Sequence, residues 1–172
     1  MRHPSDFYPT PYSIIHALLN NLNWRDVEPW EPCAGDGRFA RSMEQHYKTD
    51  VLSHDINDGY DFFDWEVARR PDLITNPPFK CIREFIDHAF EIGVKRMALV
   101  CPERVWACQK GFEQKQRHNP SRFVNLTWRE DYLNKGGAPD RALAISIWDR
   151  PHSMHTIYEV WSKPPEESYP QG

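Results

Sequence analysis

The sequence predicts an α/β protein with a mostly parallel, twisted sheet and an antiparallel C-terminal edge. In the first two thirds of the chain, short apolar segments with strand character alternate with segments in which apolar residues recur at helical spacing. In the last third, three strand-like segments follow one another. Alternation of the two kinds of segment is typical of parallel strands joined by helices, and a run of strands is typical of an antiparallel finish.

Helical spacing predicts three helices, at about residues 11–22, 37–47 and 80–91. The apolar stripes that support them are Ile14, Ile15, Leu18, Leu19 and Leu22 in the first, Phe39, Met43 and Tyr47 in the second, and Ile82, Phe85, Ile86, Ala89 and Phe90 in the third. Gly93 is a plausible end for the third helix.

Strand composition predicts a sheet strand at each of the apolar segments, at about 27–33, 51–56, 72–75, 96–101, 123–128, 142–148 and 156–161. Only twenty residues separate Asp55 from Asn76. A helix, a strand and a second helix do not fit into this length, so we expect the usual third strand to be absent or vestigial.

Size and composition bound the organisation of the chain. A length of 172 residues indicates a single domain over residues 1–172, without an insertion large enough for a separate target-recognition domain. No stretch approaches the ~20 apolar residues of a membrane span, and no signal peptide is visible at the start. The four cysteines lack zinc-ligand spacing, which predicts no metal site and a reduced, cytoplasmic protein. Residues 163–172, rich in proline and glutamate, are expected to be a loose tail.

A glycine loop follows the first predicted strand. Gly35 and Gly37 permit positive φ and a close approach of a ligand to the backbone, ahead of a helix N-terminus. Glu31, at the end of the strand, suits a ligand ammonium group and is a poor neighbour for a pyrophosphate. The third glycine of the dinucleotide fingerprint is missing, so the loop fits an amino-acid-bearing ligand better than NAD.

Asp55 ends the second predicted strand. An acidic residue at this place in a doubly wound sheet binds the two hydroxyls of a ribose. Acidic residues at strand ends are also ordinary turn formers, so Asp55 gains weight only together with the glycine loop.

The segment Asn76–Pro77–Pro78–Phe79 follows the third predicted strand. Two prolines end the ladder and hold the backbone extended, leaving the Asn76 side chain and the Pro77 carbonyl as acceptors. Two acceptors beside the flat face of Phe79 suit a planar group that carries an exocyclic amine, such as a nucleobase. Taken alone, the same pattern is also a common strand-ending turn with a core phenylalanine.

In their order and spacing, these three motifs resemble those of the S-adenosylmethionine-dependent DNA adenine-N6 methyltransferases, over about residues 5–100. The resemblance implies the Rossmann-like class I methyltransferase fold, S-adenosylmethionine as cofactor, and methyl transfer to the N6 amine of adenine in DNA. It is strongest to the small stand-alone enzymes of phages and prophages, which would place the protein in the cytoplasm of a bacterial or phage-infected cell, as a monomer or weak dimer.

The resemblance also assigns residues to the site. The opening Thr10–Pro11 would lie against the methionine part of the cofactor, and Asp61–Phe62 would surround its adenine. The cofactor-binding residues are then expected to be Tyr8, Thr10, Pro11, Glu31, Cys33, Ala34, Gly35, Gly37, Asp55, Ile56, Asp61, Phe62 and Asn76. The catalytic set is expected to be Asn76, Pro77, Pro78 and Phe79.

Residues 110–122 carry a local charge of +3, from Lys110, Lys115, Arg117 and Arg122 against Glu113. We expect this segment to be a loop near the carboxyl ends of the strands, where it would contact nucleic-acid phosphates. Charged segments are more often solvated loops. Tyr132, in the later loop, is a candidate for the second face of the target base.

Three functions remain open from the sequence. The first is the DNA adenine-N6 methyltransferase, with little sequence specificity because no recognition domain is present. The second is an RNA guanine-N2 or adenine methyltransferase, because Asn-Pro-Pro-Phe also occurs there; a protein-glutamine methyltransferase uses a similar motif, but Phe79 and the lack of an N-terminal substrate domain disfavour it. The third is a catalytically silent cofactor-binding fold that acts as an interaction protein.

Overall fold

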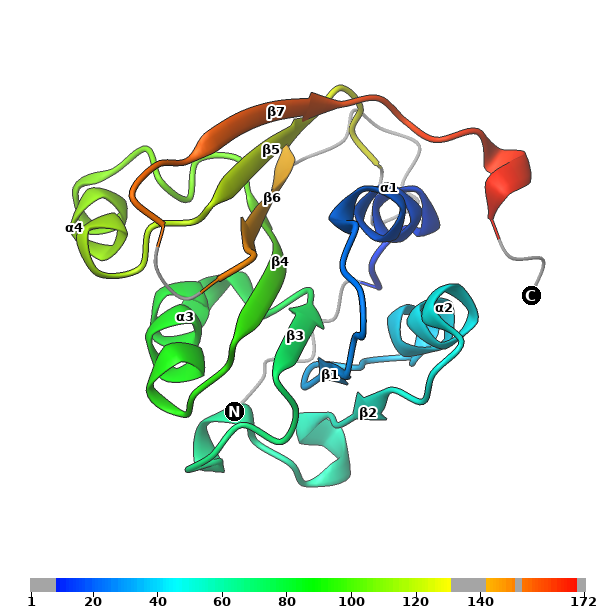
Figure 1. Cartoon of the computed structure of the whole chain (residues 1–172), viewed down its shortest axis with the longest axis horizontal. Coiled ribbons are helices and arrows are strands. Elements are labelled where there is room, and N and C mark those ends of the chain that lie inside the picture. Colours follow the sequence, from blue (N-terminus) through cyan, green and yellow to red (C-terminus); the bar gives the residue numbers. More distant parts are fainter. Residues whose placement is uncertain (1–8, 131–141, 151–152, 170–172) are drawn as a thin grey trace.

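The computed structural model describes residues 9–130, 142–150 and 153–169, and shows one seven-stranded sheet in the order β2-β1-β3-β4-β6-β5-β7 (Figure 1). The strands are β1 (Pro29–Glu31), β2 (Leu52–Ser53), β3 (Asp72–Thr75), β4 (Arg96–Pro102), β5 (Arg122–Leu126), β6 (Leu143–Trp148) and β7 (Ile157–Trp161). Each observed strand lies inside a predicted strand or extends beyond it by one residue.

The sheet is mostly parallel. β2, β1, β3 and β4 pair in parallel, whereas β6 runs antiparallel to both of its neighbours, β4 and β5. The antiparallel pairing therefore lies in the C-terminal part of the sheet, as predicted. The outermost strand, β7, pairs in parallel with β5.

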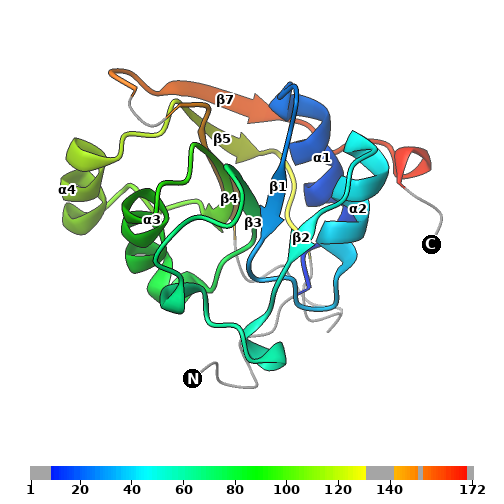
Figure 2. The same ribbon diagram turned by 60° about the horizontal axis from the view of Figure 1, so that its bottom comes forward.

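Helices cover both faces of the sheet. They are α1 (Tyr12–Leu22), α2 (Arg38–Tyr47), α3 (Ile82–Glu91) and α4 (Gln109–Arg117). Figures 1 and 2 show α1 and α2 together on one face and α3 and α4 side by side on the other. The first three helices confirm the helical spacing read from the sequence, whereas α4 was not predicted.

The core consists of two hydrophobic clusters, one on each face of the sheet. Ile74 and Ala98 belong to the cluster under α1 and α2, and Leu73 and Met97 belong to the cluster under α3. Neighbouring residues of one strand thus face opposite clusters, as the pleat of a strand requires. Burial on both faces explains why these strands are continuous apolar segments rather than alternating ones.

No third strand of the conventional kind forms within the segment between Asp55 and Asn76, as predicted. This segment instead contains two short 3-10 turns, Ile56–Asp58 and Phe62–Asp64, before β3 begins. β2 is consequently an edge of the sheet, and the two turns lie over the carboxyl ends of the strands.

The tail that the sequence predicts to be loose makes two contacts with the domain in the part that the structure describes. Tyr169 stacks on His16 of α1 with ring centroids 5.1 Å apart, and Lys163 lies 3.3 Å from Glu130. Lys163 and Tyr169 therefore contact the body of the domain, whereas Pro165, Glu166 and Glu167 between them are exposed. None of the helices in the described ranges has the length and hydrophobicity that a membrane span needs.

Candidate active site at the carboxyl ends of the parallel strands

The glycine loop after β1 is attached to the end of β2. The His54 amide donates to the Glu31 carbonyl at 2.9 Å, and the Ala34 amide donates to the His54 carbonyl at 2.9 Å. Gly35 and Gly37 have φ values of 57° and 77°, which confirms the glycine turn that the sequence predicted. These contacts place the N-terminus of α2 beside the ends of β1 and β2.

Asp55 holds the same loop through its carboxylate. The Gly35 amide donates to Asp55 Oδ2 at 2.8 Å, and the Asn57 amide donates to Oδ1 at 2.9 Å. Asp55 is buried and lines the larger cavity described below. It thus has a structural role that the sequence did not indicate, because it fixes the glycine loop to the following turn.

Glu31 is a buried carboxylate at the end of β1. It accepts a hydrogen bond from the Thr75 hydroxyl and one from the Cys33 amide at 2.9 Å. Its side chain lines a small cavity of about 20 Å³ together with Thr10, Ala34, Gly35 and Asn76. A buried carboxylate at a ligand cavity is stabilised by a cationic partner, and this chemistry agrees with a ligand ammonium group.

His54 lies behind the loop and is held in its neutral form. Its Nδ1 accepts a hydrogen bond from the Trp30 indole nitrogen at 3.1 Å. Partial burial, with a smaller contribution from Arg69, lowers the pKa of His54 below its usual value. Neutral His54 supports Trp30 in the core beneath the site.

Asn76, directly after β3, has one amide atom paired and the other unsatisfied. Its Nδ2 donates to the Thr10 hydroxyl oxygen at 3.0 Å. Its Oδ1 is buried and has no hydrogen-bond partner among the described residues. Most buried polar atoms in proteins have a hydrogen-bond partner. Because Asn76 lines the small cavity, its Oδ1 is a candidate acceptor for a donor of a ligand.

The residues that follow Asn76 turn the chain into α3. Pro77 is buried, Pro78 lines the larger cavity, and Phe79 begins the 3-10 turn Phe79–Cys81. The half-buried Phe79 ring packs against both hydrophobic clusters. The ring therefore stands at the place where the two faces of the sheet meet, beside the Asn76 amide.

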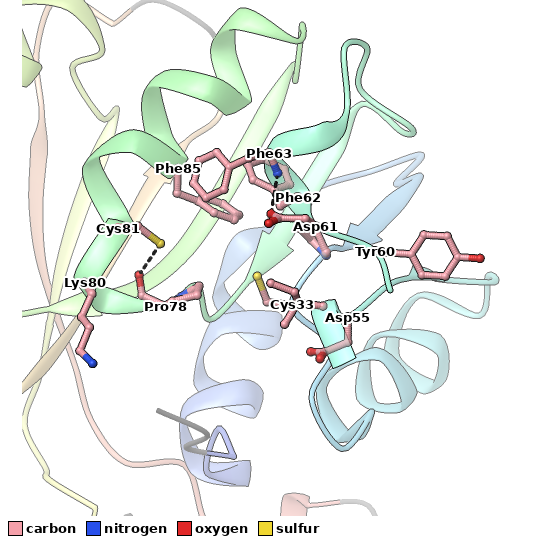
Figure 3. A pocket seen from close by; sticks show the side chains of 12 residues that line it. Cys33, Asp55, Tyr60, Asp61, Phe62, Phe63, Pro78, Lys80, Cys81 and Phe85 are labelled. Atoms are coloured by element: carbon pink, nitrogen blue, oxygen red, sulfur yellow. Dashed lines mark hydrogen bonds between the residues drawn. The ribbon is translucent and has the colours of Figure 1, made fainter. Parts of the chain in front are cut away.

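The larger cavity, of about 310 Å³, adjoins the small one through Cys33, which lines both. Figure 3 shows Phe62, Phe63 and Phe85 on one side of the cavity, with Cys33 and Asp55 across from them. The complete lining is Pro32, Cys33, Asp55, Ile56, Tyr60, Asp61, Phe62, Phe63, Pro78, Lys80, Cys81 and Phe85.

Two neighbouring phenylalanines on the aromatic side of this cavity, Phe62 and Phe63, differ in their exposure. Phe62 is buried and stacks on Phe85, with centroids 4.0 Å apart. Phe63 is 39% exposed, and its amide donates to Asp61 Oδ1 at 3.0 Å. Phe62 is thus largely a core residue, and Phe63 offers the freer surface to a ligand.

Most of the predicted cofactor residues come together here. Thr10, Glu31, Cys33, Ala34, Gly35, Asp55, Ile56, Asp61, Phe62 and Asn76 all line one of the two cavities. Pro11 and Gly37 lie at the starts of α1 and α2 and do not line either cavity. Tyr8 lies outside the described residues.

The sequence did not indicate Tyr60, Phe63, Lys80, Cys81 or Phe85 as cavity residues. Tyr60 and Phe63 lie in or beside the 3-10 turn Phe62–Asp64, Lys80 and Cys81 lie in the 3-10 turn Phe79–Cys81, and Phe85 lies in the first turn of α3. No motif marks these positions. Phe85 did carry a signal, because it belongs to the apolar stripe of α3, but that stripe predicts only core packing. In the described ranges, no group of three or more potential ligands could hold a metal ion.

The expected basic loop is corrected by the structure. Most of it is helix α4, which runs from the carboxyl end of β4 toward the amino end of β5. Arg117 pairs with Asp87 at 3.0 Å, and Arg122 pairs with Glu159 at 2.5 Å.

Arg122 is the first residue of β5 and Arg117 ends α4, so both lie near the amino ends of the strands, away from the two cavities. Lys115 is in the last turn of α4, and Lys110 is exposed at its start. Tyr132 lies outside the described residues.

The fold resembles that of known methyltransferases. A modification subunit of a putative type I restriction enzyme from Vibrio vulnificus superposes with a TM-score of 0.69 at 15% identity, over 96% of this chain and 49% of that one. A putative class I S-adenosylmethionine-dependent methyltransferase from Listeria monocytogenes gives 0.58 at 10% identity, over 93% and 67%. The 23S rRNA methyltransferase ErmE gives 0.56 at 14% identity, over 86% and 70%.

These similarities establish the architecture, which is the Rossmann-like class I methyltransferase fold. The chain spans about half the length of the Vibrio protein. No protein-family model matches the sequence, and no curated protein matches it either.

Proposed function

We propose that this protein binds S-adenosylmethionine and transfers its methyl group to the N6 amine of adenine in DNA. The observation that carries the proposal is the buried Asn76 Oδ1, an acceptor without a partner among the described residues, at the end of β3 and beside the cavities. The Vibrio protein with the same fold is named as the modification subunit of a restriction enzyme, which agrees with a DNA substrate.

The residues that line the two cavities have the chemistry that the proposed cofactor requires. The buried Glu31 carboxylate of the small cavity suits its ammonium group, and the larger apolar cavity suits the adenine. Asp55 follows β2 and lines the larger cavity, where its carboxylate would accept hydrogen bonds from the ribose hydroxyls. When bound, the cofactor supplies an electrophilic methyl group on its sulfonium.

The protein's part in the reaction is to position the target amine. Asn76 Oδ1 and the Pro77 carbonyl accept its two hydrogens, which draws the nitrogen toward a pyramidal and more nucleophilic geometry. Phe79 stacks on the base. Such positioning supplies ~7–11 kcal/mol when the reacting atoms are held in line. In duplex DNA the base must first leave the stack, at a cost of a few kcal/mol.

Labelled S-adenosylmethionine tests the substrate class directly. The purified protein is incubated with DNA that lacks N6-methyladenine, with ribosomal RNA, and with protein substrates. We expect label in N6-methyladenine of DNA. Label in RNA guanine or adenine would replace the DNA assignment by the RNA one. Cofactor binding without transfer to any substrate would favour an interaction protein.

Asn76→Ala tests the mechanism. We expect methyl transfer to fall about a hundredfold or more, the range seen when one positioned transition-state hydrogen bond is removed. Thermal unfolding and cofactor affinity should stay close to wild type, because Glu31 and Asp55 remain. Asn57→Ala is the matched control, since that exposed residue contacts Asp55 only through its backbone. Wild-type turnover in Asn76→Ala would refute the proposed role of the amide.

A further inference from the structure

The side-chain amide of Asn76 works as an acceptor only in one of its two orientations. With Oδ1 toward the target amine, it accepts a hydrogen. With Nδ2 there, it would present a donor to another donor. Both orientations have nearly the same shape, so something outside the amide must select between them.

Thr10 is the group that contacts the other end of the amide. Its Oγ1 lies 3.0 Å from Asn76 Nδ2, and the residue is 6% exposed. The contact joins the segment before α1 to the end of β3, across 66 positions of sequence. In this arrangement the buried Oδ1 is left without a partner among the described residues, and Asn76 is one of the residues that line the small cavity.

Thr10 itself stands on a well-anchored element. Pro11 follows it at the N-cap of α1, and Ser13 lies in the first turn of this helix. The Ser13 hydroxyl donates to Glu130 Oε1 at 2.5 Å, and the Trp128 indole donates to Ser13 Oγ at 3.1 Å. The N-terminal turn of α1, which directly follows Thr10 and Pro11, is therefore tied to the segment after β5.

We propose that Thr10 is a positioning residue for the reaction, which fixes the Asn76 amide with Oδ1 facing the target amine. This inference rests on the proposed function. It gives Thr10 a role in the chemical step that is separate from contact with the cofactor. Thr10→Val keeps the shape of the side chain but removes the only oxygen that Nδ2 contacts within the described residues.

Kinetics provide the first test. In Thr10→Val we expect kcat to fall about ten- to a hundredfold, because a buried donor loses its partner and the acceptor orientation is no longer enforced. The KM for DNA should change less than about twofold, since the phosphate and stacking contacts remain. Thr10→Ser restores the hydroxyl and should return kcat to within about threefold of wild type. Thr127→Val, at an exposed threonine, is the matched control.

A double-mutant cycle separates this role from contact with the cofactor. If Thr10 acts through Asn76, Thr10→Val should cause no further loss in the Asn76→Ala background, measured in single turnovers with excess enzyme. A loss of equal size in both backgrounds would overturn the inference, because the hydroxyl would then act on the cofactor or on the fold.

A spectroscopic measurement tests the contact independently of turnover. The side-chain amide signals of Asn76, identified by their absence in Asn76→Ala, should shift in Thr10→Val and stay in place in Thr127→Val. Unchanged signals in an active protein would overturn the inference and leave the proposed function intact. A wild-type protein that methylates no adenine would overturn both, even with shifted signals.

Discussion

Asp55 shows how one side chain serves both the fold and the proposed site. Its two carboxylate oxygens accept hydrogen bonds from the backbone amides of Gly35 and Asn57, and Asp55 itself lines the larger cavity. A carboxylate has about four acceptor positions, so ribose hydroxyls can share it with these amides. The same residue thus holds the glycine loop and, in the proposed function, also binds the cofactor.

Asp55→Ala is expected to weaken S-adenosylmethionine binding about tenfold or more and to lower the free energy of unfolding by about 1–3 kcal/mol. The stability loss follows because the backbone amides of Gly35 and Asn57 lose a charged acceptor. Calorimetry and urea unfolding measure the two effects separately.

Asp55→Asn is the control, because it keeps one acceptor oxygen in an almost identical shape. It should lose less stability than Asp55→Ala while still binding the cofactor more weakly than wild type. Equal cofactor affinity in all three proteins would remove Asp55 from the site.

The site residues that the sequence did predict are those whose residue type and position after a strand indicate a role. Asn76 follows β3 directly, and Asp55 and Gly35 lie in the short loops after β2 and β1. The carboxyl ends of parallel strands meet at one edge of a sheet. Phe63 and Lys80 reach the same cavity from a short turn and from the start of a helix. Their direction depends on how those segments pack, which no local pattern of residues contains.

At the scale of elements, α4 explains why one prediction failed. Its sequence has no apolar stripe, because the helix packs on α3 through polar contacts. The Gln114 side chain donates to the Arg83 carbonyl at 2.7 Å and to Asp87 Oδ1 at 3.1 Å. Periodicity of apolar residues cannot detect such a helix, whereas the strands and the first three helices bury apolar faces and were predicted.

Gly111 is the residue that lets α4 pack so closely. A Cβ atom at this position would lie 2.6 Å from the Val105 carbonyl oxygen and 2.9 Å from Trp106 Cα. Both contacts are with backbone, so no side-chain rotation relieves them.

Gly111→Ala should therefore lower the free energy of unfolding, by about 1–3 kcal/mol, although alanine is the better helix former by about 1 kcal/mol. Urea unfolding measures the change. Gln116→Ala, at an exposed position of the same helix, should leave stability within about 0.5 kcal/mol of wild type. A stabilised Gly111→Ala protein would show that the close approach is absent in solution.

At the scale of the whole molecule, the position of a charged side chain in the fold matters more than the local charge of its sequence segment. The question is which edge of the sheet the side chain lies at. The net charge of −4 gives no general attraction to nucleic acid. Lys80 lines the larger cavity, and the exposed Arg104 follows the carboxyl end of β4. Arg117, at the C-terminal end of α4, is paired with Asp87 of α3. Phosphate contacts near the site therefore fit Lys80 and Arg104 better than the segment that the sequence favoured.

The salt dependence of DNA binding distinguishes these two locations. Replacement of Lys80 and Arg104 by alanine should reduce the slope of log affinity against log salt concentration by about 0.9 for each lost phosphate contact. Lys115 and Arg117, replaced together by alanine, remove the same charge and should leave the slope unchanged. Binding is measured with duplex DNA in the absence of cofactor, so that an effect of Lys80 on the cavity does not enter. A reduced slope in the second variant alone would assign the phosphate contacts to the basic segment and place them at the amino-terminal edge of the sheet, opposite to the edge that the sequence predicted.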